Sequence, residues 1–187
     1  MIIRRGLLAK VEQEAGGLRV GAWAGVVSVV TLAAAGLIGM AAKQPWLFPS
    51  LGPTIMVLAE TPRHASAHPR NVLLGHLVGV GAGYLALVVT GLTDAPPIID
   101  TGITGSRIAA AIVCLALTAL VLQAIRVSHP PAGATTLIVG LGLLDSPTQL
   151  LAILLSVLLV TILAALLNVV AGIRQKGVRG TADTGQR

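Results

Sequence analysis

The chain has 187 residues, of which 55% are hydrophobic and 11% are charged, and its formal net charge at pH 7 is +6. Soluble domains carry roughly 25% charged residues, so this composition excludes an ordinary soluble globular domain and indicates an integral membrane protein. The single cysteine, Cys114, excludes an internal disulfide and a cysteine-based metal site.

The chain begins with a charged, amphipathic segment. Apolar residues at positions 2, 3, 7, 8 and 11 approximate one helical face, and charged residues occupy the rest of the segment. These charges interrupt any apolar core, which is unlike a cleavable signal peptide. We therefore expect residues 2–17, within an N-terminal segment 1–20, to form a helix at the membrane interface.

Four long apolar stretches follow, at residues 21–42, 71–92, 107–125 and 150–173. Each is close to the roughly 20 residues that a membrane-spanning helix requires. Two shorter apolar stretches, 46–59 and 127–144, carry Pro and Gly near their starts, and they either cross as broken helices or dip in and return. The sequence thus predicts one transmembrane domain at 21–173, followed by a polar, disordered tail at 174–187.

The basic residues favour six crossings. If all six stretches cross and the N-terminus is cytoplasmic, eleven of the thirteen basic residues lie inside, which follows the positive-inside tendency. Only Lys43 and Arg107 then lie outside. Re-entrant short stretches would instead place Arg63 and Arg70 outside. We therefore expect an integral protein of a bacterial plasma (inner) membrane with both termini in the cytoplasm.

A shift of 81 residues brings the two halves of the chain into register. Pro49, Gly52 and Thr54 then align with Pro130, Gly133 and Thr135, and the spans of residues 21–92 align with those of 102–173. Three spans are an odd number, so the second copy must insert upside down. The predicted fold is an all-α polytopic membrane helix bundle of two inverted three-helix repeats, each with a Pro/Gly-broken central helix.

The two breaks have the chemistry of a small-anion site. Proline favours the first turn of a helix, so Pro49 or Pro53, and Pro130 or Pro131, would begin short helices that run to about residues 59 and 144. The start of a helix exposes free N–H groups and carries about half a positive charge. Glycines let a ligand approach the backbone, and hydroxyl groups add donors; the candidates are Gly52, Gly133, Ser50, Thr54, Ser128, Thr135 and Thr136.

Two histidines lie at membrane depth. His129 either donates to an anion or carries a proton with it, because its unperturbed pKa is about 6.5, or it only bonds a carbonyl freed by the prolines. His76 either faces the pathway or packs within a stripe of Gly75, Gly79 and Gly83. The other two histidines, at positions 64 and 68, read as part of a solvated basic loop, and no spacing of ligands predicts a metal or another cofactor.

The glycine stripe predicts close packing of two helices. It could instead serve self-association. We expect a homo-oligomer because six short spans leave little room for a transport pathway within one subunit. Tyr84, Gln123 and Asn168 are lone polar residues within spans, of the kind that usually bond across a helix interface.

Three separated motifs resemble the HPP family of integral membrane proteins, which is named for its His-Pro-Pro motif. They are residues 129–135 (HPPAGAT), 48–54 (FPSLGPT) and 69–76 (PRNVLLGH), and the resemblance covers roughly residues 20–172. It implies about four spanning helices and, from plastid and cyanobacterial relatives, transport of nitrite. Some members carry a C-terminal pair of CBS regulatory modules, which we do not expect in a chain of this length.

The residues and the resemblance together predict a passive or proton-linked carrier or channel for a small inorganic anion such as nitrite. The predicted substrate-binding residues are His129, Gly133, Thr135, Gly52 and Thr54, with Ser50 and His76 in second place. The alternative is a non-transporting membrane scaffold or sensor. An enzyme is disfavoured because carboxylates lie only near the ends of spans. The expected partners are the anion, the lipid bilayer and further copies of the chain, with no nucleic acid.

Overall fold

The computed structural model describes the backbone of residues 2–173 and the side chains of residues 16–173. Within these residues the secondary structure is helical, with no strand, which confirms the predicted all-α class. Residue 1 and the predicted tail at 174–187 lie outside the described residues. The predicted amphipathic face of residues 2–17 falls largely on side chains outside them too.

Four helices are long and apolar enough to cross a membrane. The first is Gly16–Ala42, the apolar part of α1 (Ile2–Ala42), and the others are α3 (Pro69–Thr90), α5 (Gly105–Ala124) and α7 (Pro147–Val170). They coincide with the four long stretches predicted from hydropathy. Proline in the first turn begins both α3 and α7, where the lost N–H has no partner within the helix.

Two short helices occupy the stretches with prolines. α2 (Leu51–Glu60) and α6 (Ala132–Gly140) follow irregular segments at 43–50 and 125–131. At 1.5 Å per residue each is about 15 Å long or less, roughly half of the hydrocarbon thickness. α6 ends four residues before the predicted residue 144, because Gly142 adopts a left-handed conformation (φ 72°) and Leu143 N–H donates to the Ile138 carbonyl.

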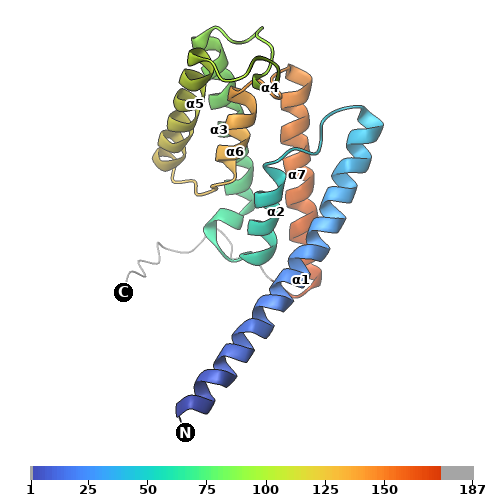
Figure 1. Cartoon of the computed structure of the whole chain (residues 1–187). Coiled ribbons are helices and arrows are strands. Elements are labelled where there is room, and N and C mark those ends of the chain that lie inside the picture. The colour runs from blue at the N-terminus through green and yellow to red at the C-terminus, as the bar shows by residue number, and fades with distance from the viewer. Residues whose placement is uncertain (1, 174–187) are drawn as a thin grey trace.

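The helices alternate in direction along the bundle. α1, α3 and α6 run towards the end that carries the short helix α4 (Ile98–Thr101), and α2, α5 and α7 run back (Figure 1). We call this the α4 end, and we call the opposite end the η1 end after the 3₁₀ turn η1 (Ala65–Ala67). Between α1 and α3, and again between α5 and α7, the chain passes from one end to the other. The two broken segments therefore traverse the bundle.

The glycine stripe of α3 is the surface on which α6 packs. A Cβ built on Gly75 would lie 2.9 Å from His129 Cβ, one on Gly79 would lie 2.8 Å from the Ala132 carbonyl oxygen, and one on Gly83 would lie 2.7 Å from Val139 Cβ. This confirms the predicted helix–helix contact. Because α6 of the same chain occupies the stripe, the stripe is not free for self-association.

The three lone polar residues differ in their surroundings. Asn168 Oδ1 accepts from Trp23 Nε1, and Asn168 Nδ2 donates to the Leu58 carbonyl oxygen, so one side chain joins α7 to α1 and α2. Tyr84 and Gln123 are exposed, and the prediction that they bond across an interface is wrong for them.

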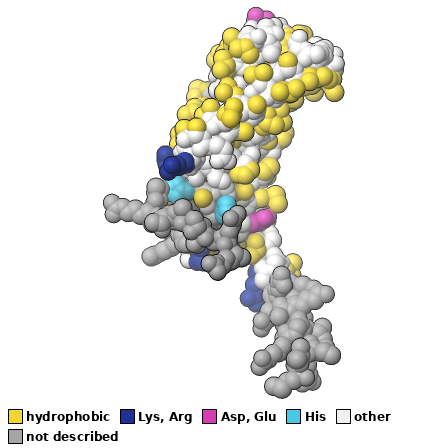
Figure 2. All heavy atoms as spheres, turned by 90° about the vertical axis from the view of Figure 1, so that its left-hand side faces the viewer, with side chains coloured by type: hydrophobic (Ala, Val, Ile, Leu, Met, Phe, Trp, Pro, Cys, Tyr) yellow, Lys and Arg dark blue, Asp and Glu magenta, His cyan; other side chains and the backbone are white. Residues whose placement is uncertain are grey.

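The outer surface of the bundle is apolar along its length. Leu37, Ile112, Leu120 and Val169 are each more than 60% exposed, which suits contact with lipid. Figure 2 shows hydrophobic side chains over most of the visible face, with basic and histidine side chains gathered towards the end where α1 enters. Four exposed basic residues belong to this half of the molecule: Arg19, Arg63, Arg70 and Arg126.

Candidate functional site

A line of hydrogen-bonded polar groups runs through the interior and joins the start of α2 to the break before α6. Ser50 Oγ lies 2.6 Å from Thr135 Oγ1, which lies 2.7 Å from His76 Nδ1. His76 Nε2 lies 3.2 Å from His129 Nε2, and His129 Nδ1 lies 2.8 Å from the Ser66 carbonyl oxygen. We call these five residues the polar line.

Thr54 supports the polar line from α2. Its Oγ1 lies 3.0 Å from His76 Nε2 and donates to the Ser50 carbonyl oxygen at 2.8 Å. The side chains of Thr54, Ser50, Thr135 and His76 are fully buried, and that of His129 is 2% exposed. The site is therefore a closed, internally bonded cluster within an apolar bundle.

Local sequence explains how these side chains meet. Ser50 and Thr54 are four residues apart at the start of α2, so they lie on one helical face. His76 is in the second turn of α3, next to Gly75, whose missing side chain leaves room for His129. Pro130 and Pro131 end the irregular segment that carries His129, and α6 then presents Thr135 one turn further on.

The hydrogen bonds of the polar line have one direction when both rings are neutral. A carbonyl oxygen only accepts, so His129 donates from Nδ1 and accepts at Nε2. The hydrogen between the two Nε2 atoms then belongs to His76, whose Nδ1 accepts from the Thr135 hydroxyl. Thr135 in turn accepts from Ser50. The single hydrogen on His76 Nε2 thus faces two acceptors, His129 Nε2 at 3.2 Å and Thr54 Oγ1 at 3.0 Å.

The backbone N–H groups at the start of α6 are paired within its first turns. Ala132, Gly133 and Ala134 donate to the carbonyl oxygens of residues 129, 130 and 131, at 3.0–3.1 Å. These donors must leave their local partners before they can bind an anion. The arrangement corresponds to a closed site at the helix starts.

Five of the seven predicted substrate-binding residues lie together, namely Ser50, Thr54, His76, His129 and Thr135. The two glycines do not join them. Gly52 is exposed, and a Cβ there would meet no atom within 4 Å of the described structure. Gly133 is half-buried, and a Cβ built there would lie 3.4 Å from Leu115 Cδ1 of α5.

Two further residues, Thr118 and Ser66, contribute to the buried polar groups and were not predicted from the sequence. Thr118 Oγ1 of α5 lies 2.8 Å from Thr136 Oγ1 of α6, next to the polar line. Its only sequence signal is that α5 carries a single threonine in an apolar face. Ser66 contributes through its backbone carbonyl, which no side-chain pattern marks.

The loop histidines have local structural roles. His64 Nδ1 accepts from Ser66 N–H, and His68 Nδ1 accepts from Arg70 N–H at the start of α3. Within the described part of the chain, no group of three or more His, Cys, Asp or Glu residues is arranged to hold a metal ion.

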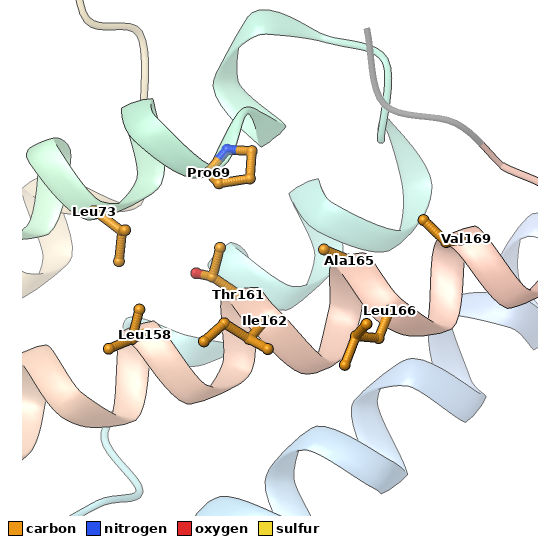
Figure 3. Close-up of a pocket in the computed structure, with 8 residues that line it drawn as sticks. All are labelled: Pro69, Leu73, Leu158, Thr161, Ile162, Ala165, Leu166 and Val169. Carbon is orange, nitrogen blue, oxygen red and sulfur yellow. The ribbon is translucent and has the colours of Figure 1, made fainter. Parts of the chain in front are cut away.

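Two surface depressions lie outside the polar line. A groove of about 260 Å³ between α3 and α7 is lined by apolar side chains and Thr161 (Figure 3). A second depression, of about 610 Å³, lies at the η1 end between the α1 segment near Arg19 and the loop after α2, with Arg63, His64 and Glu60 at its edge. Neither is lined by a residue of the polar line, so the groove of Figure 3 offers no route to it.

The fold and the site define a polytopic helical membrane protein with two broken helices that meet at a buried polar junction. The chain belongs to the HPP family, because a family model described as "HPP, transmembrane region" matches residues 13–177. No curated protein and no solved structure matches the chain.

Proposed function

We propose that this chain transports a small inorganic anion, with nitrite as the first candidate, through a site between the starts of α2 and α6. The observation that carries the proposal is the 2.6 Å contact between Ser50 Oγ at the start of α2 and Thr135 Oγ1 in the first turn of α6. It brings two Pro/Gly-broken helices together inside an apolar bundle, where irregular backbone is tolerated only if it is buried in protein or lines a cavity. Broken segments at corresponding places in two halves of a transporter point to its substrate site. Nitrite itself rests on the family resemblance.

The positions and directions of the two short helices support a site at this position. α2 begins at Leu51 and α6 at Ala132, a separation of 81 residues, which equals the shift that aligns the sequence motifs. The two short helices run in opposite directions along the bundle (Figure 1). We infer that the two halves are inverted copies, with a substrate site near the midplane where their broken helices begin.

The chemistry of the site suits an anion that carries one charge. The hydroxyls of Ser50 and Thr135 can rotate to donate, and the positive ends of two helix dipoles point to the same region. Neither Lys nor Arg contributes to the polar line within the described residues. A site built from neutral donors binds an anion weakly enough to release it again.

The histidine pair supplies a way to couple the anion to a proton. One proton fits between the two Nε2 atoms, 3.2 Å apart. A second proton would make both nitrogens donors, which cannot bond to each other. His76 Nε2–H would keep Thr54 Oγ1 as its acceptor, and His129 Nε2–H would be free to donate to an anion. Proton-linked transport is therefore the form of the proposal that uses His76 and His129.

Transport requires the closed site to open to each side in turn. The bundle offers two helix groups for this movement, because α3 packs mainly on α6 and α5 while α1 packs on α2 and α7. The polar line lies where the groups meet, since Ser50 immediately precedes α2 and His76 belongs to α3. We propose that relative movement of the two groups exposes the site alternately.

The exposed basic residues Arg63, Arg70 and Arg126 support a cytoplasmic η1 end. We further propose that the protein acts as a homo-oligomer, without catalysis. The interface then lies on a surface other than the glycine stripe, because α6 occupies that stripe.

The second candidate function is a membrane scaffold or sensor. The full burial and internal bonding of the polar line favour it, since such a junction can hold two broken helices together without a ligand. The two functions differ in flux, which only the transporter supports.

Uptake by purified protein in liposomes tests the proposal. Nitrite is compared with nitrate, chloride and formate, in the wild type and in Thr135→Val, which breaks two contacts of the polar line. The matched control is Thr161→Val, because Thr161 is also buried and bonds only to its own helix. We expect nitrite uptake that Thr135→Val abolishes and Thr161→Val leaves intact.

Two results would count against the proposal in different ways. Flux of all four anions at the level of empty liposomes would refute transport and favour the scaffold. Flux that is equal in wild type and Thr135→Val would leave transport in place and refute the site.

A further inference from the structure

Arg107 is a buried charge that the proposed site does not use. It lies in the first turn of α5, at the α4 end of the bundle, and is 2% exposed. Its Nη2 donates to the backbone carbonyl oxygens of Ala95, at 3.3 Å, and Pro96, at 2.5 Å. Its Nη1 is buried and has no hydrogen-bond partner among the side chains and backbone that the structure describes.

No acidic side chain in the described part of the chain pairs with this guanidinium. The acids at this end are Asp94 and Asp100, which are exposed, and Asp145, which is half-buried. A buried charge without a counterion is costly, because carbonyl dipoles replace only part of its hydration. The counterion that Arg107 lacks can therefore come from solution.

The backbone of Gly142 makes room for the guanidinium. Gly142 follows the end of α6, and a Cβ built there would lie 2.9 Å from Arg107 Nη1 and 3.2 Å from Nη2. Its φ of 72° is a left-handed conformation that glycine adopts without strain. The guanidinium is thus held at the opposite end of α6 from His129.

We propose that Arg107 is the first binding site for the transported anion at the α4 end, and that its ligand is a small oxyanion. This inference rests on the proposed function. Nη1 offers two uncommitted N–H donors, and planar oxyanions such as nitrite, nitrate and formate accept from a guanidinium in its own plane. Chloride has no such pair of oxygens, so Arg107 favours oxyanions over halides.

One face of α5 connects this site to the polar line. Arg107, Cys114 and Thr118 are buried at helical spacing along that face, and Thr118 bonds Thr136 beside the polar line. At 1.5 Å per residue, the eleven residues from Arg107 to Thr118 span about 16 Å. Between them lie the small buried residues Ala110 and Cys114, which pack against Ala86. These small side chains form the layer that an anion must pass.

Anion binding to purified protein tests the role of Arg107 without any need for flux. Nitrite, nitrate, formate and chloride are titrated while thermal unfolding is followed, and uptake is measured in liposomes over the same concentrations. The variants are Arg107→Gln, which removes the charge, and Arg107→Lys, which keeps the charge but not the planar fork. Lys43→Gln is the matched control, because Lys43 is an exposed basic residue at the same end.

We expect oxyanions to stabilise the wild type against thermal unfolding at lower concentrations than chloride does. Arg107→Gln should raise the half-saturating concentration of nitrite about tenfold or more, as loss of a charged hydrogen bond implies. Arg107→Lys should raise it less and reduce the preference for oxyanions, and Lys43→Gln should match the wild type. If Arg107→Gln does not fold, the test rests on Arg107→Lys, whose preference for oxyanions over chloride should be smaller than that of the wild type.

Half-saturating concentrations that are unchanged in both Arg107 variants would overturn the inference and leave Arg107 as a tie between the α3–α4 loop and α6. A wild type that no anion stabilises against thermal unfolding would also overturn the inference that Arg107 binds an oxyanion. Protection that depends on Arg107 without flux would instead refute transport and keep Arg107 as the anion site of a sensor.

Discussion

Gly79 is the position where the packing of α3 on α6 can be tested most directly. A Cβ at this position would lie 2.8 Å from the Ala132 carbonyl oxygen and 3.0 Å from Thr136 Oγ1. Ordinary contact begins at 3.4 Å, so relief of the clash with the carbonyl requires a shift of about 0.6 Å between the two helices. The first of these atoms is backbone, which cannot turn away as a flexible side chain can.

Gly81→Ala is the control for Gly79→Ala. Gly81 is exposed on the same helix, and a Cβ there would meet nothing within 4 Å of the described structure. Both substitutions gain about 0.5–1 kcal/mol of helix propensity, so that effect cancels between the two variants. Overpacking costs about 1–3 kcal/mol, and we expect Gly79→Ala to be less stable than Gly81→Ala by that amount.

Reversible unfolding in mixed detergent micelles, followed by circular dichroism, measures the difference. A Gly79→Ala variant as stable as Gly81→Ala would refute the reasoning, because it would mean that α6 does not approach Gly79 closely. A loss confined to Gly79→Ala would support the contact that positions His129 and Thr135.

Three further predictions concern other parts of the bundle. Asn168→Leu should lower the free energy of unfolding by about 1–3 kcal/mol in the same assay, because it leaves the indole N–H of the half-buried Trp23 and the buried carbonyl oxygen of Leu58 unpaired. Gly142→Ala should also destabilise the protein, by about 1–3 kcal/mol, because its methyl group meets the Arg107 guanidinium from a strained backbone. In inside-out vesicles of a Cys114→Ser background, an impermeant thiol reagent should label the Arg63→Cys variant and spare the Lys43→Cys variant; the reverse pattern would invert the proposed topology.

The long spans could be predicted because lipid imposes a simple requirement on the sequence. A helix such as α7 (Pro147–Val170) must stay apolar for about 20 residues, so hydropathy alone finds it. Proline predicts the starts of α2 and α6 to within one or two residues: the helices begin at Leu51 and Ala132, between or just after the prolines. The early end of α6 could not be predicted, because it depends on the backbone conformation of Gly142 rather than on hydropathy.

Helical geometry explains why two predicted glycines lie apart from the other site residues. Ser50 and Thr54 are four residues apart and share a face of α2, whereas Gly52 lies about 200° around the helix from Ser50 at 100° per residue. The same two-residue offset separates Gly133 from Thr135. A motif that is contiguous in the sequence predicts that all its residues lie at the site. Each helix start, however, presents only one of its faces to the other short helix.

The burial of Arg107 could not be predicted from its position at the end of a span. A basic residue there normally extends into water, and the charge pattern placed it in an outer loop. Its environment comes from the loop carbonyls of residues 95 and 96 and from Gly142, which lie 11 to 35 positions away in the sequence. Only the fold brings these groups around one guanidinium.

The proposed repeat gives a reason to regard the histidines as functional. Under the shift of 81 residues, His129 corresponds to Phe48 and His76 to Val157, and both counterparts belong to the main hydrophobic core. At these positions the junction of α2 with α7 is thus apolar, and the corresponding junction of α6 with α3 is polar. Apolar side chains can hold such a junction at no loss of stability relative to buried polar ones. Because packing alone does not require two desolvated imidazoles at the second junction, a ligand or a proton that binds there accounts for them better.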